Sequence, residues 1–430
     1  MSVDAIGLSA DLLKAVKACG YKNLTPIQQK SIPLIRRGHD LLASAQTGTG
    51  KTAAFSLPLI DLIADKKAKG NHQVKVLVLT PTRELAQQVY DNIVAYTQFM
   101  PLNAGVVYGG GAMPSQAKML KQGVDILVAT PGRLLEHSTL HNVSLSGVEH
   151  VVLDEADRML DMGFLTDINR VFDLIKHQHQ TLLFSATFSN KVKTLANQIL
   201  HTPKTIEVAK QNSTSGKVKQ AVYAVSEARK RELLSEIIGV NNWQQVLVFA
   251  GTKESANVIA KELKLDGIKA AICHGDKSQG ARNKALEQFA EGQVRVLVAT
   301  DVAARGLDIP DLPYVVNFHL PFLAEDYVHR IGRTGRAGKT GTAISLVSPK
   351  DEKFMANIET FIHRKFERIV MPGYEMTADE MAENSTKTFD KSSQNRYKTT
   401  QAKNRKIASK NKSSQPSRNK PSAKGRSKRR

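Results

Sequence analysis

Short apolar runs recur along the chain, each bounded by glycine, proline or polar residues and separated from the next by a segment long enough for a helix. In the first half these runs are "VKVLVLT" (74–80), "DILVAT" (125–130), "HVVLDEA" (150–156) and "TLLFSAT" (181–187). Their apolar residues are consecutive rather than alternating, which is typical of strands that helices cover on both faces of a parallel sheet. The pattern therefore predicts an α/β domain.

The same rhythm restarts after residue 205, which predicts a second domain of the same class. Its runs are "QVLVFAGT" (245–252), "KAAICHG" (269–275), "VRVLVATD" (294–301), "YVVNFHL" (314–320) and "TAISLVS" (342–348). The tetrapeptide Leu-Val-Ala-Thr ends a predicted strand at 127–130 and again at 297–300, which hints at an ancient duplication. A polar segment at 209–220 is typical of a linker, so we expect domains at 1–208 and 221–370.

Composition places most of the charge excess at one end of the chain. The 430 residues are 41% hydrophobic, which supports a globular protein of two or three domains. Lys and Arg number 61 against 40 Asp and Glu, but residues 391–430 alone contain 15 of the basic residues and no acidic one. The remaining 46 basic residues nearly balance the 40 acidic ones.

The segment 371–430 is predicted to be a disordered basic tail. Its last forty residues contain almost no large apolar side chain and cannot bury enough surface to offset the entropy of ordering. A basic arm of this kind binds a phosphate backbone without regard to sequence, and salt weakens that binding. A tail that only keeps the protein soluble is the alternative.

Cysteine usage and hydropathy bound the cellular context. Cys19 and Cys273 lack any CxxC or Cys/His metal spacing, so we expect free thiols in a reducing compartment. The N-terminus does not follow the pattern of a secretory leader, and 18 consecutive apolar residues occur nowhere in the chain. We therefore expect a soluble, cytoplasmic protein that does not bind a membrane.

A glycine-rich turn joins an apolar strand to a helix in "LLASAQTGTGKTAAF" (41–55). Residues 45–52 fit the phosphate-binding P-loop, with Gly50, Lys51 and Thr52 in place and Ala45 instead of the first glycine. Backbone N–H groups of such a turn cradle phosphates, Lys51 would reach the β and γ phosphates, and the Thr52 hydroxyl would bind Mg²⁺. An ordinary strand-to-helix turn is the alternative, but motif and context agree.

A P-loop needs a carboxylate at the end of a nearby strand, and "VVLDEADRML" (151–160) supplies it. Asp154 would orient Mg²⁺ through its water shell, and Glu155 would polarise the attacking water. The alternative is that Asp154, Glu155 and Asp157 merely form an acidic helix start. That alternative does not explain the buried strand before them.

These segments, with "PTREL" (81–85), "TPGR" (130–133), "SAT" (185–187) and "HRIGRTGR" (329–336), resemble the motifs of the DEAD-box RNA helicases in the expected order over residues 3–370. "WQQVLVF" (243–249), "HGDKSQGARNKAL" (274–286) and the basic tail look most like the bacterial RhlE-type subgroup. The resemblance implies two tandem RecA-like domains with a monomeric core. It also implies RNA-stimulated hydrolysis of ATP with Mg²⁺, coupled to local, non-processive unwinding of short RNA duplexes and to RNP remodelling. Ribosomal precursors and mRNA-decay complexes are the candidate partners.

The resemblance assigns the nucleotide site residue by residue. Tyr21 would stack on adenine and Gln28 would hydrogen-bond its edge, so ATP is expected over GTP. Thr25, Pro26 and Gln28 also fit a capping box, and both roles can hold together. Val3 stands where the family usually has a further aromatic residue. The remaining nucleotide contacts are Gln46, Thr47, Gly48, Thr49, Gly50, Lys51, Thr52 and, for the ribose, Asp308.

Two arginines of "HRIGRTGR" are expected to complete this site. The second half has no P-loop of its own, so Arg333 and Arg336 would meet the γ-phosphate that the first half holds. Arginine fingers of this kind are worth about 10³ to 10⁵ in rate. Binding of the RNA backbone is the alternative for this segment. We assign Arg330 and His329 to domain contacts.

The resemblance also implies coupling and RNA-binding residues. Ser185 and Thr187 would hydrogen-bond Asp157 and link hydrolysis to domain closure, although hydroxyls at a strand end are more often simple turn formers. RNA would be held through its backbone, independently of sequence. The residues implied are Pro81, Thr82, Arg83, Gly110, Thr130, Gly132 and Arg133 in the first half, and Thr252, Gln279, Arg282, Thr300, Asp301 and Arg305 in the second.

Two other classes of function fit part of the pattern. One is an ATP-gated RNA clamp or annealing chaperone whose basic tail does most of the binding. The other is a translocating DNA helicase on the same paired domains, which the "DEAD" and "SAT" spellings disfavour. Stimulation of ATP hydrolysis by single-stranded DNA as strong as that by RNA would favour the latter.

Overall fold

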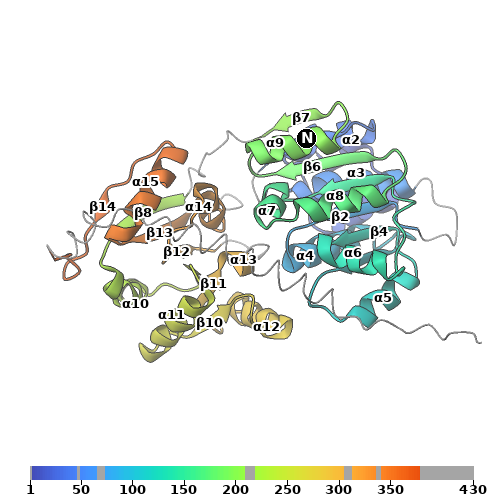
Figure 1. Ribbon diagram of the computed structural model, residues 1–430. Coiled ribbons are helices and arrows are strands. Elements are labelled where there is room, and N and C mark those ends of the chain that lie inside the picture. Colours follow the sequence, from blue (N-terminus) through green and yellow to red (C-terminus); the bar gives the residue numbers. More distant parts are fainter. Residues whose placement is uncertain are drawn as a thin grey trace, which may run out of the picture. The chain divides into compact units, whose positions relative to one another are not determined.

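The computed structural model describes residues 2–45, 49–64, 73–208, 218–304, 312–335 and 340–377. These residues form two parallel sheets, and helices flank each sheet on both faces (Figure 1). We call residues 2–208 the N-terminal lobe and residues 218–375 the C-terminal lobe. The expected fold class, two tandem α/β domains of the RecA-like kind, is confirmed.

The described residues of the N-terminal lobe contain seven strands and ten helical segments. The strands are β1 (Leu41–Ser44), β2 (Val76–Leu79), β3 (Ala104–Val107), β4 (Ile126–Ala129), β5 (His150–Leu153), β6 (Gln180–Ser185) and β7 (Lys204–Glu207). The helices are η1 (Val3–Ile6), α1 (Ala10–Ala18), α2 (Pro26–Arg36), α3 (Lys51–Ala64), α4 (Arg83–Thr97), α5 (Met113–Lys121), α6 (Pro131–Thr139), α7 (Ala156–Asp161), α8 (Leu165–Leu174) and α9 (Asn190–Ile199). The sheet order is β3-β4-β2-β5-β6-β1-β7, and all of its pairs are parallel.

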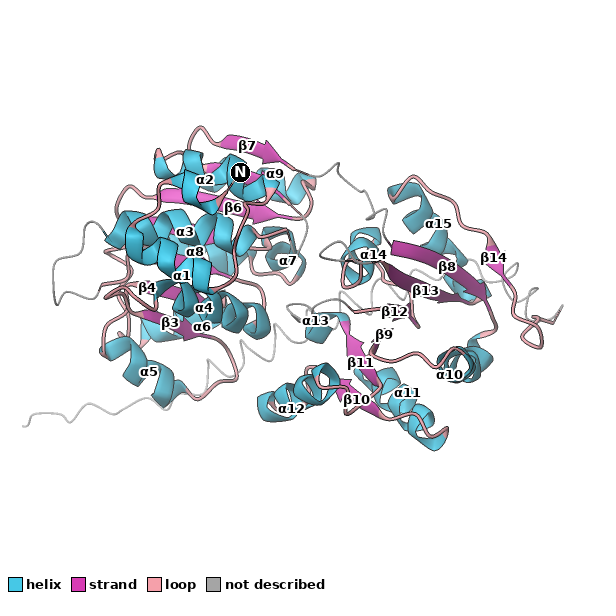
Figure 2. Cartoon of the chain, turned by 180° about the vertical axis from the view of Figure 1, so that it is seen from behind, coloured by secondary structure: helices cyan, strands magenta, loops and turns pink. Residues whose placement is uncertain are grey.

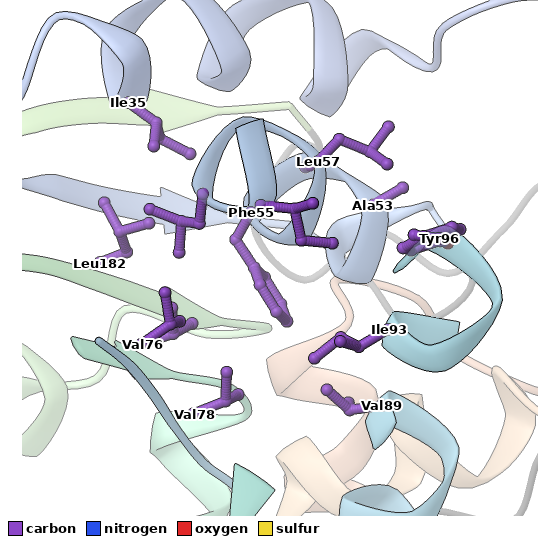
Figure 3. Packing of buried hydrophobic residues seen from close by; sticks show 14 of the residues in the cluster. Ile35, Ala53, Phe55, Leu57, Val76, Val78, Val89, Ile93, Tyr96 and Leu182 are labelled. Carbon is purple, nitrogen blue, oxygen red and sulfur yellow. The ribbon is translucent and has the colours of Figure 1, made fainter. Parts of the chain in front are cut away.

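Alternate residues of each strand enter two separate cores, which explains the consecutive apolar runs. In β2, Val76 and Val78 pack with helices α1 to α4, whereas Leu77 and Leu79 pack with the helices on the opposite face. Phe55 of α3 points toward the sheet and lies among Val76, Val78 and Leu182 (Figure 3). This packing fixes α3, and therefore the turn that precedes it, against the centre of the sheet.

The C-terminal lobe repeats this architecture. Its described strands are β8 (Val218–Ala224), β9 (Val246–Ala250), β10 (Ala270–Cys273), β11 (Val296–Thr300), β12 (Tyr314–Asn317), β13 (Gly341–Val347) and β14 (Arg368–Ile369). Its described helices are η2 (Glu227–Arg229), α10 (Lys230–Val240), α11 (Lys253–Leu265), α12 (Gln279–Ala290), α13 (Asp301–Ala304), α14 (Ala324–Ile331), η3 (Pro349–Asp351) and α15 (Glu352–Phe361).

The two sheets have the same strand order. The second sheet reads β10-β11-β9-β12-β13-β8-β14, which becomes the order of the first sheet when its strands are numbered from β8. Both copies of Leu-Val-Ala-Thr therefore lie on the fourth strand of their lobe, at the end of β4 and in β11. The shared topology supports the duplication that the repeated tetrapeptide suggested, and it assigns each strand a counterpart in the other lobe.

Two expected boundaries differ from the structure. β8 begins at Val218 and pairs with β13, so residues 218–220 belong to the second sheet rather than to the linker. Their polar side chains at 219 and 220 made a strand start look like a loop. Tyr374 is buried in the core of the C-terminal lobe, so that lobe extends past residue 370, where the tail was expected to begin. The rest of the expected linker and nearly all of the expected tail lie outside the described residues.

Two further expectations concern cysteines and membrane segments. Both cysteines are free thiols, with Cys19 exposed and Cys273 buried, as expected. Among the residues that the structure describes, no helix has the length and apolar character needed to cross a bilayer.

Candidate nucleotide and RNA site

Predicted nucleotide residues gather at one half of the first sheet. They follow β1, β5 and β6, which are neighbours in the order β5-β6-β1. In a parallel sheet the carboxyl ends of all strands meet at the same edge, and ligands bind outside that edge. Lys51, Asp154 and Thr187 therefore leave neighbouring strands at one edge.

Lys51 is the first residue of α3, and its side chain is only 6% exposed. Its Nζ lies 3.9 Å from Asp154 Oδ1 and has no hydrogen-bond partner among the described residues. A buried ammonium group without hydrogen bonds is costly. Its place at the N-terminus of a helix, where backbone N–H groups are also unpaired, makes this point of the lobe strongly attractive to an anion.

Asp154 faces Lys51 from the end of β5. Burial raises the pKa of its carboxyl to about 6, Lys51 opposes this shift, and Glu155 adds to it. Its Oδ1 accepts a hydrogen bond from the Glu155 N–H at 3.0 Å. A desolvated carboxylate of this kind gains from a nearby cation, which suits it to hold Mg²⁺.

Glu155 is held in a rare backbone conformation. It precedes α7 with φ 54° and ψ 51°, in the left-handed region that residues with a Cβ seldom adopt. Such strain persists only where surrounding structure enforces it, and it is frequent at functional sites. The conformation turns the chain sharply after β5 and keeps both Asp154 and Glu155 at the carboxyl edge of the sheet.

Asp157 is tied to the end of β6. Its Oδ2 accepts hydrogen bonds from the Thr187 N–H at 3.1 Å, the Thr187 hydroxyl at 3.2 Å and the Ala186 N–H at 3.2 Å. The expected contact with Thr187 is therefore present. The Ser185 hydroxyl instead donates to the Thr187 carbonyl at 2.6 Å, so Ser185 shapes the turn rather than reaching Asp157.

Gln28 connects the capping box to the phosphate-binding turn. Its Oε1 accepts from the Thr25 N–H at 2.9 Å, and its Nε2 donates to the Gly50 carbonyl at 3.1 Å. Gly50 has φ +89°, and a Cβ there would lie 2.4 Å from Gln28 Nε2. Only glycine fits this position, and the capping role of Gln28 coexists with a place beside the P-loop.

Tyr21 has an aromatic partner that the sequence did not reveal. Its hydroxyl lies 2.8 Å from the hydroxyl of Tyr96 on α4, and the two rings meet edge to face at 6.1 Å. Val3, in the place of the family's usual aromatic residue, is buried and packs in the core of the lobe. Tyr96 is 75 residues from Tyr21 in the chain, and no local motif marks it.

Predicted RNA-binding residues occupy the other half of the first sheet. They follow β2, β3 and β4, which are neighbours in the order β3-β4-β2. Thr82 and Thr130 are the N-cap residues of α4 and α6. The Thr82 hydroxyl accepts from the Leu85 N–H at 3.3 Å, and the Thr130 hydroxyl accepts from the Gly109 N–H at 3.4 Å. Pro81 immediately precedes the first of these caps, and Gly132 lies in the first turn of α6.

A turn at 109–111 lies between two of the predicted arginines. Gly110 has φ +80°, and a Cβ there would lie 2.3 Å from an Arg83 guanidinium nitrogen. On the other side, Arg133 Nη1 donates to the Gly111 carbonyl at 3.0 Å. Gln116, which no sequence motif marks, accepts from Arg133 at 3.3 Å and donates to the Tyr108 carbonyl at 3.1 Å. The structure thus brings Arg83, Gly110 and Arg133 together.

In the C-terminal lobe, the described RNA candidates follow the counterpart strands β9, β10 and β11. Thr252 caps α11 as Thr82 caps α4, with its hydroxyl accepting from the Ser255 N–H at 3.0 Å. Gln279 and Arg282 lie in the first turn of α12, Thr300 ends β11, and Asp301 begins α13. Both lobes therefore present the same three strand ends.

Arg330 corrects an expectation. It was assigned to contacts between domains, but its guanidinium forms a bidentate pair with Asp301 of its own lobe, at 2.6 and 2.7 Å. It also donates to Asn317 Oδ1 at 3.2 Å and to the His319 carbonyl at 2.6 Å. Four hydrogen bonds to a planar, buried guanidinium fix the end of α14 against the end of β11. Arg333 follows three residues later, with its N–H bonded to the Arg330 carbonyl at 3.1 Å.

Lys230 gives an internal comparison for Lys51. Both are the first residue of the long helix that follows the first strand of their lobe. Lys230 is fully buried, but its Nζ lies 2.8 Å from Glu227 and 2.5 Å from Asp351. The ammonium of Lys230 is thus paired with two carboxylates, whereas the ammonium of Lys51 has no hydrogen-bond partner among the described residues and could bind an anion.

Some predicted residues lie outside the described part of the chain. These are Gln46, Thr47 and Gly48 of the P-loop, Arg305 and Asp308 after α13, and Arg336. Among the residues that are described, no three His, Cys, Asp or Glu side chains cluster as a ready-made metal site.

Known proteins match the chain across both lobes. Family models for the DEAD/DEAH box helicase and the helicase conserved C-terminal domain match residues 25–195 and 229–338. The DEAD-box ATP-dependent RNA helicases RhpA of Helicobacter pylori and CshA of Bacillus subtilis are each 41% identical to it, over 86% and 87% of this chain and 74% of their own. The structure of S. cerevisiae Dbp5 bound to RNA and ADP BeF3 superposes with a TM-score of 0.77 at 31% identity, covering 86% of this chain and 95% of that one. The chain therefore belongs to the DEAD-box ATP-dependent RNA helicases, a family of ATP-hydrolysing enzymes.

Proposed function

We propose that the chain binds ATP and Mg²⁺ at the carboxyl ends of β1, β5 and β6 and uses ATP hydrolysis to open short RNA duplexes locally, without travelling far along the RNA. The observation that carries the proposal is the ammonium of Lys51. It is buried at a helix N-terminus, without a hydrogen bond among the described residues, whereas its counterpart Lys230 is paired with two carboxylates. The triphosphate would supply the missing negative charge.

The donor set also fits a magnesium ion held jointly with phosphates. Asp154 and the Thr52 hydroxyl are its proposed protein ligands. Mg²⁺ usually keeps several waters and takes only one or two side-chain ligands, and a single buried carboxylate with one hydroxyl matches that number. When bound, the ion neutralises charge that develops on the β and γ phosphate oxygens.

The protein groups around the phosphates have separate proposed tasks. Lys51 holds the β and γ phosphates, and Glu155 orients the attacking water and accepts its proton. Arg333 and Arg336 stabilise the transferring phosphoryl group from the second lobe. Tyr21 and Gln28 select adenine, Asp308 binds the ribose, and Gln46 to Gly50 line the phosphates.

Coupling to RNA is proposed to run through Asp157 and Thr187. The hydrogen bonds between them join the start of α7, next to Glu155, to the turn after β6. RNA would lie along the strand ends β2, β3 and β4 and their counterparts β9, β10 and β11, with its backbone held by N-cap hydroxyls, glycines and arginines. Such contacts carry little sequence information. A bent single strand held this way excludes a duplex, so a few base pairs open as the clamp forms.

Two finer assignments rest on sequence. We assign the chain to the bacterial RhlE-type subgroup from residues 243–249 and 274–286. We also propose that the basic residues 391–430 add RNA affinity independent of sequence, in a cytoplasmic protein that acts on ribosomal precursors or in mRNA decay. Truncation before Lys391 should then lower both RNA affinity and its salt dependence.

Strand release by Glu155→Gln protein tests the proposal. A short RNA duplex with a single-stranded overhang would be mixed with excess protein, and both strand release and phosphate release would be followed. We expect ATP-dependent release of one strand, with hydrolysis slowed by about 10²-fold or more. Glu207→Gln, which changes an exposed glutamate on β7, serves as the control and should behave as wild type.

Other results would favour a different function. Release that does not depend on ATP, together with tail-dependent annealing, would favour the clamp or annealing chaperone. Stimulation of ATP hydrolysis by single-stranded DNA equal to that by RNA would favour a DNA helicase. Either outcome contradicts the proposal.

A further inference from the structure

The free edge of the second sheet borders a basic groove whose lining contains none of the proposed nucleotide or RNA residues. β10 is the end strand of this sheet, and no described strand pairs with its outer side. Figure 2 shows β10 between α11 and α12. Residues of β10 and one face of α12 line an open groove of about 530 Å³, which we call the β10 groove. This volume is within the range of pockets that bind small molecules or short peptide segments.

Charge in the β10 groove has a single sign. Its lining includes Lys264, Lys269, Lys277 and Lys284, and it contains neither Asp nor Glu. Lys264, Lys269 and Lys284 are exposed, and no ion pair of these four lysines is present among the described residues. A patch of unpaired cations attracts an acidic partner and steers its approach. The same charge repels the chain's own C-terminal forty residues, which are basic and lack acidic side chains.

The floor of the groove is apolar and includes Ile272 and Ala285. It presents no hydroxyl and no arginine, the groups that gather on the proposed RNA surface. Alternate residues of an edge strand also direct unpaired N–H and C=O groups outward, where another strand can pair with them. The groove thus combines lysines at its rim, an apolar floor and an unpaired strand edge. This combination matches an extended peptide better than the phosphate backbone of RNA.

We propose that the β10 groove binds an extended acidic peptide segment of a partner protein, which adds as a strand to the edge of β10. Main-chain hydrogen bonds to β10 would supply affinity, as in other cases of strand addition. Alternate apolar side chains of the segment would contact the floor near Ile272, and its carboxylates would meet the lysines. This surface would give the helicase a docking site for protein partners that is separate from its nucleotide and RNA contacts.

The test uses the full-length protein and a defined probe. The probe is a fluorescein-labelled eight-residue peptide that alternates glutamate and valine, and its binding is measured by fluorescence anisotropy. Lys269→Glu with Lys284→Glu is expected to weaken binding about ten-fold, because two favourable charge contacts become repulsive. Lys403→Glu with Lys406→Glu makes the same charge change in the tail and should change the affinity by less than about two-fold.

Probe chemistry tests strand pairing independently of protein folding. N-methylation of one set of alternating residues should abolish binding, and methylation of the other set should be tolerated, because a strand pairs through only one of its edges. Equal binding of both methylated peptides would overturn strand addition. Absence of any peptide binding would overturn the proposal. The lysines would then serve only to prevent edge-to-edge aggregation of the sheet.

RNA provides the remaining control. A fluorescein-labelled single-stranded oligouridine should bind the Lys269→Glu, Lys284→Glu protein within about two-fold of wild type. A loss of RNA affinity as large as the loss of peptide affinity would make the groove part of the RNA surface and overturn the proposal. RNA-stimulated ATP hydrolysis close to wild type establishes that the variant is folded, and Lys269→Ala with Lys284→Ala replaces it otherwise.

Discussion

The ammonium nitrogen of Lys51 lies 3.9 Å from Asp154 Oδ1, too far for a hydrogen bond, although both side chains are almost fully buried. The lobe thus holds a cation and a carboxylate within ion-pair distance but without a hydrogen bond between them. A triphosphate with Mg²⁺ would satisfy both groups at once. The free energy cost of this arrangement would then be recovered on nucleotide binding.

Lys51→Met should destabilise its lobe much less than Lys230→Met. Loss of Lys51 should change the free energy of unfolding of the N-terminal lobe by no more than about 1 kcal/mol, because a buried ammonium without hydrogen bonds is relieved while Asp154 loses a cation at 3.9 Å. Loss of Lys230 should lower the free energy of unfolding of the C-terminal lobe by about 3 kcal/mol, because Glu227 and Asp351 lose their partner. Thermal unfolding without nucleotide measures both. Equal destabilisation by the two substitutions would show that Lys51 is already paired.

Acid should weaken the C-terminal lobe through Asp351. Burial alone would raise the pKa of this carboxyl, but Lys230 and Ser348 lower it overall below its ordinary value of 3.8. A carboxyl whose pKa is lowered by folding stabilises the protein above its unfolded pKa, and this contribution is lost as the pH falls through the folded pKa. Asp351→Asn should therefore cost about 2 kcal/mol at pH 7 and progressively less below pH 4. A constant difference between pH 7 and pH 3 would contradict this account.

Glu155→Gly should stabilise the protein while it stops hydrolysis. Glycine adopts the left-handed backbone of this residue without the steric cost that glutamate has there, a gain of about 1 kcal/mol that is partly offset by the freedom of glycine in the unfolded chain. Glu155→Gln keeps the strained backbone and is the matched control for lost chemistry. Melting temperatures should rank the glycine variant above the glutamine variant. The reverse order would mean that the side chain of Glu155 stabilises the turn.

Gly110→Ala should impair RNA stimulation of the ATPase, and Gly109→Ala should not. A Cβ at residue 110 would collide with the Arg83 guanidinium and would also oppose the positive φ, whereas a Cβ at residue 109 meets nothing within 4 Å. The first substitution should raise the RNA concentration for half-maximal stimulation about ten-fold, with ATP hydrolysis in the absence of RNA unchanged. Similar effects of the two substitutions would show that Arg83 does not contribute to RNA binding.

The sequence predicted the strands and the phosphate turn because their signals are local. Apolar runs, the glycines near Lys51 and the acids after β5 each occupy a few consecutive residues, and the paired rhythm revealed two domains. The hydrogen bond between Tyr21 and Tyr96 could not be predicted, since 75 residues separate them and a single tyrosine on a helix does not indicate a contact with a distant residue. Arg330 was misassigned for a similar reason, because the proximity of Asp301 follows from the neighbouring positions of folded elements and not from the motif.

Some site properties depend on geometry that no motif encodes. The hydrogen bonds of Thr187, but not of Ser185, to Asp157 follow from the shape of the turn after β6. The neutralised ammonium of Lys230 became comparable to Lys51 only when both sheets showed the same strand order. The family motifs indicated candidate site residues, whereas the structure shows which of the described candidates are held in place and by which contacts.

The most direct measurement is a crystal structure of the full-length protein with single-stranded RNA and ADP·BeF₃, which mimics bound ATP. The account predicts that Lys51 Nζ and the Arg333 guanidinium both lie about 3 Å from the beryllofluoride, with the RNA at the strand ends β2, β3 and β4 and their counterparts. A closed complex in which Arg333 points into solvent, or in which Lys51 pairs with Asp154 instead of the phosphates, would contradict it.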